Sequence, residues 1–263
     1  MTLRLRLLTF FLLAGCLMAR GQDLRTGVPT ADGGFLVAGE YLAWLDADGE
    51  PVRKRPLEQP LTAMAARGES LYALDADGRE LIELDREGLV VAREKLPVQG
   101  RLTALAADGK TLWAVTDAGE ILHDGSGWTV FDFNAQYDGY YPRMEFLTVA
   151  AGGGSVMVAG IRPDGTPAAY TSARGTVWSE RTLDYSEQGQ TCVFSAVPMN
   201  LSYDAVQDRF FLLGVGGMEL ALPGCSHCNS LTHYPLDTLY ARIPGNLGSL
   251  LLGSDGFRRV EKR

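Results

Sequence analysis

The stretch SLYALDADGRELIEL, residues 70–84, decides the fold of this chain. Five residues that favour strands, Ser70–Leu74, precede the turn sequence DADG at 75–78. Asp-Gly favours a tight turn between two strands, because glycine accepts a positive φ angle without a steric penalty. After the turn, apolar and charged residues alternate in the way that is typical of a half-buried strand. We therefore predict a β-hairpin with strands at 70–74 and 80–84.

Close variants of this hairpin recur along the chain, for example at residues 42–49, 111–119, 155–165 and 249–256. The segment that precedes each hairpin repeats more clearly. LTAMAARG (61–68), LTALAADG (102–109) and FLTVAAGG (146–153) match one another. They follow at a spacing of about 40 residues, which is the period of four-stranded propeller blades. The sequence predicts an all-β propeller over residues 23–263, with about six blades of four antiparallel strands.

The two ends of this repeat array are expected to complete each other. The last unit begins near Leu239 and offers only three strands, whereas Leu24–Val28 lies ahead of the first unit. We expect Leu24–Val28 to pair with Phe257–Glu261 and so to close the ring, because this pairing would cover two otherwise exposed strand edges.

Residues 1–22 have the pattern of an export signal, with arginines before an apolar run that is too short to span a membrane permanently. LAGC at 13–16 resembles the lipobox of bacterial lipoproteins, which implies cleavage before Cys16 and lipidation of Cys16. Several acyl chains together would hold a domain on a membrane. We expect a lipid-anchored protein of the bacterial cell envelope. Cleavage after Gly21 is the alternative, and it would give a soluble periplasmic or secreted protein.

Composition narrows the function further. The net charge of −8 argues against nucleic acid as a partner, because a phosphate-binding surface needs clustered Lys and Arg. The sequence contains no Gly-x-Ser-x-Gly elbow, no His-Glu-x-x-His motif and no phosphate loop. We therefore expect a monomeric binding or scaffolding protein rather than an enzyme, without a cofactor.

The repeat is interrupted at residues 135–143, AQYDGYYPR, which is longer than a link between blades requires. Tyrosine offers a large contact area at low entropic cost, together with a hydroxyl that can orient a ligand. Candidate ligand-binding residues for a protein or glycan partner are therefore Tyr137, Asp138, Tyr140, Tyr141 and Arg143. Alternatively, these rings cap the channel mouth or pack on a neighbouring blade.

The alternative function is that of a glycan-active hydrolase or lyase with its site at the channel mouth. Such an enzyme needs converging carboxylates. The grouped candidate residues for this site are Asp138, Tyr141, Arg143 and Glu145.

A second insertion, residues 186–199, contains Cys192, and the pair Cys225 and Cys228 follows in a Cys-x-x-Cys arrangement. In an exported protein the default is a disulfide, either from Cys192 to one member of the pair or within the pair. A less favoured alternative is a zinc site with the ligands Cys192, Cys225, Cys228 and His233.

The segment TSARGTVW, residues 171–178, resembles the Asp-box turn of sialidase-like and BNR-repeat propellers. Thr171, Gly175 and Trp178 stand at the Ser/Thr, Gly and Trp positions of that motif, and Ala173 replaces its Asp. In those families the Asp box is a folding device remote from the active site, so the resemblance implies a propeller and no sialidase activity. A similar likeness exists to the Ycf48-like group of BNR propellers, which are assembly factors.

Overall fold

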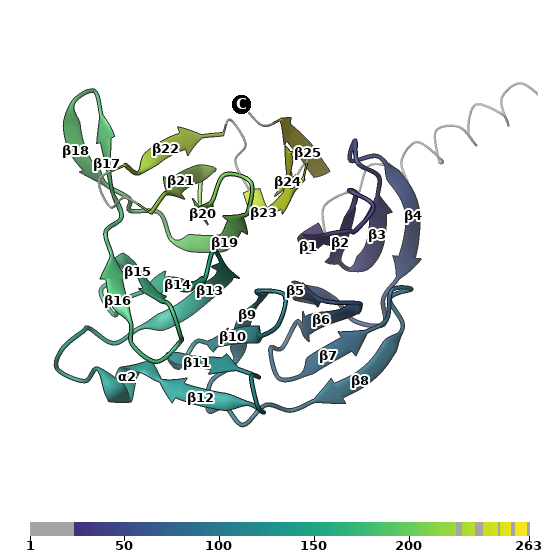
Figure 1. The fold of residues 1–263 in the computed structure, drawn as a ribbon, viewed down its shortest axis with the longest axis horizontal. Helices are drawn as coiled ribbons and strands as arrows, with labels where there is room; N and C mark the ends of the chain where they lie inside the picture. Colours follow the sequence, from purple (N-terminus) through teal and green to yellow (C-terminus); the bar gives the residue numbers. More distant parts are fainter. Residues whose placement is uncertain (1–23, 225–227, 235–238, 247, 254–255, 262–263) are drawn as a thin grey trace, which may run out of the picture.

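The computed structural model describes residues 24–224, 228–234, 239–246, 248–253 and 256–261. Within these ranges the chain forms β-strands and one short helix, α2 (Phe133–Gln136). None of the described helices is long and apolar enough to cross a membrane. Apart from the two-stranded sheet of β17 (Asp184–Glu187) and β18 (Gln190–Val193), the described sheets are arranged radially around a common axis, each with its first strand innermost (Figure 1).

Five antiparallel sheets of four strands, which we call blades 1 to 5, follow one another in chain order. A sixth sheet, with three described strands, stands between blade 5 and blade 1. Their strands are β1–β4 (Leu24–Pro29, Phe35–Gly39, Tyr41–Leu45, Pro51–Pro56), β5–β8 (Leu61–Arg67, Ser70–Asp75, Leu81–Leu84, Val90–Glu94), β9–β12 (Leu102–Ala107, Leu112–Thr116, Glu120–His123, Thr129–Asp132), β13–β16 (Glu145–Gly152, Ser155–Ile161, Pro167–Ser172, Ser179–Arg181), β19–β22 (Pro198–Asp204, Arg209–Gly214, Met218–Leu222, Ser230–His233) and β23–β25 (Leu239–Gly245, Gly248–Gly253, Gly256–Glu261).

The all-β propeller is therefore confirmed, but the prediction of six four-stranded blades is wrong, since five blades have four strands. The predicted closure is also wrong. β1 pairs with β2, from Leu24 opposite Gly39 to Pro29 opposite Phe35, while β25 pairs with β24. A tight turn joins β1 to β2, so this local pairing costs less chain entropy than pairing with the far end of the chain.

Side-chain packing, rather than a shared strand, closes the ring. β1 lies beside β23, the inner strand of the three-stranded sheet. Leu24, Phe35 and Val37 of blade 1 form one buried cluster with Ala241, Ile243, Leu250 and Leu252. Burying apolar surface is favourable by roughly 25 cal/mol per Å², so the interface needs no strand pairing across it.

The hairpin at residues 70–84 is confirmed as β6 and β7, the middle strands of blade 2. Its turn is closed by a hydrogen bond from the Gly78 N–H to the Asp75 carbonyl. Gly78 has a φ of +63°, and a Cβ there would lie 2.2 Å from the Leu102 carbonyl oxygen. The Leu102 N–H in turn donates to the Gly78 carbonyl at 2.8 Å. Glycine therefore lets the turn of blade 2 dock directly on the first residue of β9 in blade 3.

A β-bulge recurs at the same place in every inner strand of the ring. The extra residue is the second residue of β1, β5, β9, β19 and β23, and the third of β13. The bulge residues are Arg25, Thr62, Thr103, Leu147, Met199 and Tyr240.

Polar side chains directly after three of these bulges connect neighbouring sheets. Thr26 Oγ1 accepts from the Met64 N–H at 2.9 Å, and Thr148 Oγ1 accepts from the Leu201 N–H at 2.8 Å. Asn200 Oδ1 accepts from the backbone N–H of Arg242 at 3.0 Å. These bonds satisfy inner-strand N–H groups, which are costly to leave unpaired when buried.

Candidate functional site

The insertion at 135–143 begins with α2, on the outer rim between blades 3 and 4 and away from the axis (Figure 1). Asp132 caps the helix, because its Oδ1 accepts from the Ala135 N–H at 2.9 Å. Asn134 then clamps both ends of the insertion. Its Nδ2 donates to the carbonyls of Ala118 and Met144, and its Oδ1 accepts from the Met144 N–H at 2.7 Å. The insertion is thus a closed, hydrogen-bonded loop.

Two of the three predicted tyrosines anchor this loop to blade 4. The Tyr137 hydroxyl accepts from the Trp178 N–H at 2.8 Å and donates to the Trp178 carbonyl at 3.3 Å. Tyr141 stacks on Phe133, at an interplanar angle of 10°, and its ring also contacts Tyr170. The alternative that these rings pack on a neighbouring blade therefore describes Tyr137 and Tyr141, and neither lies at the channel mouth.

Tyr140 is presented outward from the same loop, with 76% of its surface exposed. Its backbone N–H donates to the Tyr137 carbonyl at 2.9 Å, and its ring meets Tyr141 edge-on at 4.7 Å between centroids. A large exposed aromatic side chain that is held in this way loses little entropy on binding a partner.

A cleft of about 620 Å³ opens beside the loop, on the face formed by the connections β8–β9, β10–β11, β12–β13 and β14–β15. Its charged lining residues are Asp117, Glu120, Asp132, Asp138, Arg143, Glu145 and Arg162. The residues of the insertion thus have two different roles. Tyr137 and Tyr141 anchor it to blade 4, whereas Asp138 and Arg143 face the cleft.

Four of the charged residues in the cleft already hold other parts of the chain. Glu120 is 5% exposed and accepts from the backbone N–H groups of Gln99 and Gly100. Asp117 accepts from the Arg101 N–H at 2.7 Å, Asp132 caps α2, and Arg162 pairs with Glu180. These four residues shape the cleft and have little capacity left for a ligand.

The other three charges, Asp138, Arg143 and Glu145, are exposed. Within the part of the chain that the structure describes, their side chains have no hydrogen bond or ion pair. Sequence reasoning had named all three. The structure brings two carboxylates and one guanidinium together at the cleft, and all three are available to a partner.

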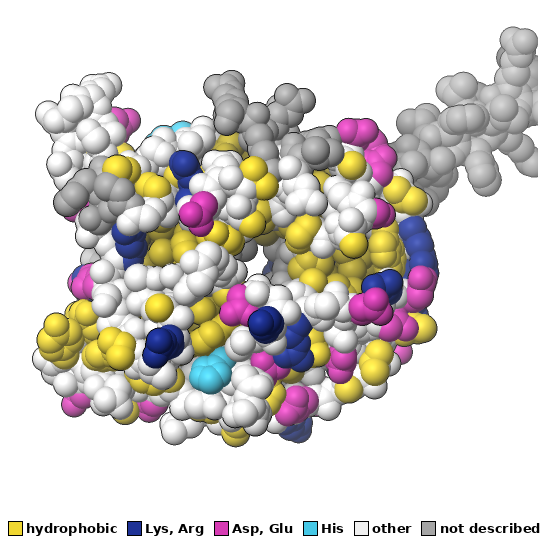
Figure 2. Space-filling view, in the orientation of Figure 1, with side chains coloured by type: hydrophobic (Ala, Val, Ile, Leu, Met, Phe, Trp, Pro, Cys, Tyr) yellow, Lys and Arg dark blue, Asp and Glu magenta, His cyan; other side chains and the backbone are white. Residues whose placement is uncertain are grey.

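The central channel, of about 310 Å³, is lined by the inner strands of the five blades and of the three-stranded sheet. Figure 2 shows its opening at the centre of the molecule. Among the described residues that line it there is no Asp, Glu or His, and the charged ones are Arg25 and Arg242. The described part of the channel lining therefore does not contain the converging carboxylates that a hydrolase or lyase needs.

A buried charge cluster joins blade 5 to the three-stranded sheet, and sequence reasoning missed it. Arg242 Nη1 donates to Glu219 Oε1 at 2.8 Å, and Asp204 Oδ2 lies 3.7 Å from Arg242 Nη2. The guanidinium also lies 3.7 Å above the ring centre of Phe211. Burial, assisted by the charge of Glu219, raises the pKa of the neighbouring Tyr234 to about 12. The sequence does contain a sign of this cluster, because Glu219 and Arg242 each stand within an otherwise largely apolar strand.

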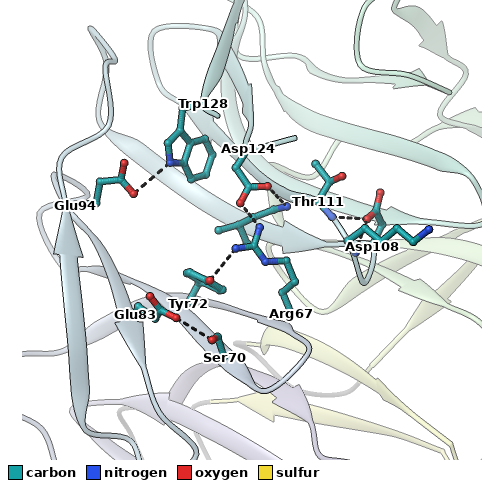
Figure 3. Close-up of polar contacts among 11 residues, drawn as sticks. Arg67, Ser70, Tyr72, Glu83, Glu94, Asp108, Thr111, Asp124 and Trp128 are labelled. Atoms are coloured by element: carbon teal, nitrogen blue, oxygen red, sulfur yellow. Dashed lines mark hydrogen bonds and ion pairs between the residues drawn. The ribbon is translucent and has the colours of Figure 1, made fainter. Parts of the chain in front are cut away.

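A second polar network, shown in Figure 3, links the hairpin of blade 2 to blade 3. Arg67 pairs with Asp124 and donates to the Tyr72 hydroxyl at 2.8 Å. Asp124 also accepts from the Leu112 N–H at 2.8 Å. Since each of these groups is bound to another part of the chain, the network holds two blades together.

Two of the three cysteines predicted to form a disulfide, Cys192 and Cys228, lie within the described residues. Cys192, on β18 (Gln190–Val193), is half-buried with a free thiol, and Cys228 is exposed. Cys225 and the lipidation candidate Cys16 lie outside the described residues. A disulfide from Cys192 is not found, and the described part of the chain contains no cluster of three His, Cys, Asp or Glu side chains that could hold a metal.

No known protein-family model matches this chain, and no curated protein matches it in sequence. Its fold is similar to that of a virginiamycin B lyase from Staphylococcus aureus, with a TM-score of 0.59 and 8% identity over 92% of this chain and 85% of that one. A structure from a nidogen/laminin complex gives a TM-score of 0.60 and 15% identity over 88% and 85% of the two chains. YCF48 from Cyanidioschyzon merolae gives a TM-score of 0.53 and 12% identity over 90% of this chain and 84% of that one. These likenesses establish the β-propeller fold alone.

The turn that resembles an Asp box is built without its Asp. Ser172 is buried, and its Oγ accepts from the Gly175 N–H at 2.8 Å and from the Arg174 N–H at 3.3 Å. Trp178 is 2% exposed, and its Nε1 donates to the Gly175 carbonyl. The side chain that closes the turn is therefore that of Ser172, whereas the likeness to the motif had pointed to its neighbour Thr171. Through Trp178, this turn also supports the candidate binding loop.

Proposed function

We propose that this chain is an exported, lipid-anchored β-propeller of the bacterial cell envelope, and that it binds a partner at the cleft beside α2. The observation that carries the binding role is the group Asp138, Arg143 and Glu145, whose charges are not used within the described chain. Groups that fold stability does not require, on a loop that the fold holds rigidly, are typical of binding sites.

The fixed loop supports this role energetically. The backbone of a loop that is already ordered by Asn134 and Tyr137 loses little further entropy on binding. Tyr140 supplies an exposed aromatic contact on the same loop. Tyr and Arg are enriched among the residues that dominate the energy of protein interfaces, so we propose a protein partner, with a glycan as the alternative that the experiment can distinguish.

Site-directed photocrosslinking in the producing bacterium tests the binding role. Benzoylphenylalanine at position 140 is expected to give one discrete adduct, and the same group at Val52 is the control, because Val52 is 71% exposed on the outer strand β4 of blade 1. Combined charge reversal, Asp138→Lys with Arg143→Glu, is expected to abolish the adduct at 140. Sensitivity of the adduct to protease or to glycosidase identifies the partner's class.

The proposal fails if positions 140 and 52 give the same products, or if charge reversal leaves the adduct at 140 unchanged. Circular dichroism of the charge-reversed variant shows whether it is folded. The substituted residues are exposed, so a folded protein is expected.

The lipid anchor has its own test. Mass spectrometry of the mature, unreduced protein is expected to show acyl chains on Cys16 as the first residue, and Cys16→Ser is expected to release the protein from the membrane fraction. A mature chain that begins after Gly21 would contradict the anchor and leave the binding site unaffected. The same spectrum reports the oxidation state of Cys192, Cys225 and Cys228.

A further inference from the structure

The recurring bulges arrange one residue from each inner strand around the central channel. We call these residues the bulge ring: Arg25, Thr62, Thr103, Leu147, Met199 and Tyr240. All of them line the channel. Each is half-buried or exposed, whereas the residue before it is buried. A bulge leaves its extra residue unpaired and re-aims the side chain, and on an innermost strand the free edge faces the axis.

The bulge ring is divided into two chemically different halves. Blades 1 to 3 contribute Arg25, Thr62 and Thr103, which are polar, with one cation. The remaining half is apolar or aromatic, and it consists of Leu147, Met199 and Tyr240. Because the sheets follow chain order around the axis, each half is continuous.

The charge at the ring is positive although the chain is acidic. The net charge of the chain is −8, yet no described residue in the channel lining is acidic. Arg242, the other lining arginine, is neutralised by Glu219. Arg25 is exposed and lines the channel, and within the described chain its side chain has no hydrogen-bond or ion-pair partner. An arginine in this position offers a planar fork of donors that matches a carboxylate.

The threonines define what the polar half can accept. Thr62 Oγ1 donates to the Asp75 carbonyl at 3.1 Å, and Thr103 Oγ1 donates to the Phe146 carbonyl at 2.8 Å. Their hydroxyl protons are used, so these oxygens can only accept from a ligand. Within the polar half, Arg25 is therefore the residue that can donate to an anion.

We infer that the bulge ring is a second binding site, for a small amphipathic carboxylate whose charged end pairs with Arg25 and whose apolar end lies against Leu147, Met199 and Tyr240. The channel volume of about 310 Å³ suits a small molecule, since ligand pockets span about 300–1,000 Å³. The site lies on the axis, whereas the α2 loop lies on the rim, so it is separate from the proposed partner cleft.

Titration calorimetry on the mature protein, with four simple probes, tests this assignment. Hexanoate carries both the charge and the apolar body, acetate only the charge, 1-hexanol only the apolar body, and hexylamine the opposite charge. Hexanoate is expected to bind at least about tenfold more tightly than 1-hexanol and hexylamine, because a charge-assisted hydrogen-bond pair is worth about that factor or more. The same margin is expected over acetate, because acetate lacks the methylene groups that hexanoate buries against the apolar half of the ring.

Two matched arginine variants locate the site. Arg25→Gln removes the charge in the ring and is expected to weaken hexanoate binding about tenfold or more. Arg79→Gln removes an exposed charge from the hairpin turn of blade 2, outside the channel lining, and is expected to leave binding unchanged. Leu147→Asn is expected to weaken hexanoate while leaving acetate unaffected.

Three results would overturn the inference. They are equal affinities for hexanoate and hexylamine, equal losses in Arg25→Gln and Arg79→Gln, and no heat of binding with hexanoate at millimolar concentration while circular dichroism shows a folded protein. Since the photocrosslinking experiment does not involve the channel, failure here leaves the proposed partner cleft standing.

Discussion

The hydroxyl of Tyr137 is expected to be the main polar anchor of the α2 loop, and Tyr137→Phe removes it with little other change. The ring stays in contact with Phe133 and Tyr141, at 4.9 and 5.2 Å between centroids. The hydroxyl gives up two hydrogen bonds, one from the Trp178 N–H at 2.8 Å and one to the Trp178 carbonyl at 3.3 Å.

The size of the stability loss depends on the burial of Trp178, which is 2% exposed. Solvent therefore has little access to the Trp178 N–H and carbonyl once the Tyr137 hydroxyl is removed. A hydrogen bond contributes about 0.5–1.5 kcal/mol net, and an unsatisfied buried donor costs about 1–3 kcal/mol. Tyr137→Phe is therefore expected to lower the free energy of unfolding by about 2–3 kcal/mol. In a domain of this size that corresponds to a fall in Tm of roughly 4–12 °C.

Urea denaturation followed by tryptophan fluorescence measures the loss, with Trp178 itself among the reporters. Two other tyrosines of the loop are matched controls. Tyr140 is 76% exposed, so Tyr140→Phe is expected to change stability by less than about 0.5 kcal/mol. Tyr141 receives a long bond of 3.4 Å from the Glu180 N–H, so Tyr141→Phe is expected to cost about 0.5 kcal/mol. Equal effects of Tyr137→Phe and Tyr140→Phe would refute the proposed anchoring.

Three further substitutions test other parts of the propeller. Ser172→Ala removes the bond to the Gly175 N–H and is expected to cost about 1–2 kcal/mol in urea denaturation, whereas unchanged stability would show that another group bonds the turn. Arg242→Met leaves Glu219 buried without its cation, so we expect a loss of about 3–5 kcal/mol, and replacing both residues by apolar ones should recover most of it; a double variant as unstable as the single one contradicts this reasoning. The pKa of Tyr234 is raised from 10.0 to about 12, so its contribution to stability is complete below pH 10 and is lost as the pH rises toward 12. Tyr234→Phe should flatten the fall of Tm over that interval, and identical slopes in the two proteins would exclude this role.

Interactions between residues close in the chain were the most predictable. Asp75 and Gly78 form their turn within one hairpin, and the same pattern at intervals of about 40 residues predicted the propeller. The insertion at 135–143 was visible because it interrupts that pattern. The predicted pairing of β1 was wrong, because the sequence of Leu24–Pro29 does not say which of two free strand edges this strand joins.

The candidate site was predicted in part. Asp138, Arg143 and Glu145 do meet at a cleft, but the roles of the three tyrosines in the loop differ for a tertiary reason. Tyr137 meets Trp178, which is 41 residues away in the chain, whereas Tyr140 points to solvent. The spacing of tyrosines within the loop contains no information about which ring finds a partner.

The sequence by itself determined the strands, their turns and the repeat, because these depend on alternation and on glycine, both of which act over a few residues. The tertiary structure alone decided which side chains face the channel. A bulge shifts the alternation by one residue, and where it falls depends on pairing with the next strand. For that reason Arg25, Leu147 and Tyr240 are accessible around one axis, although the residues on either side of each in the sequence are buried.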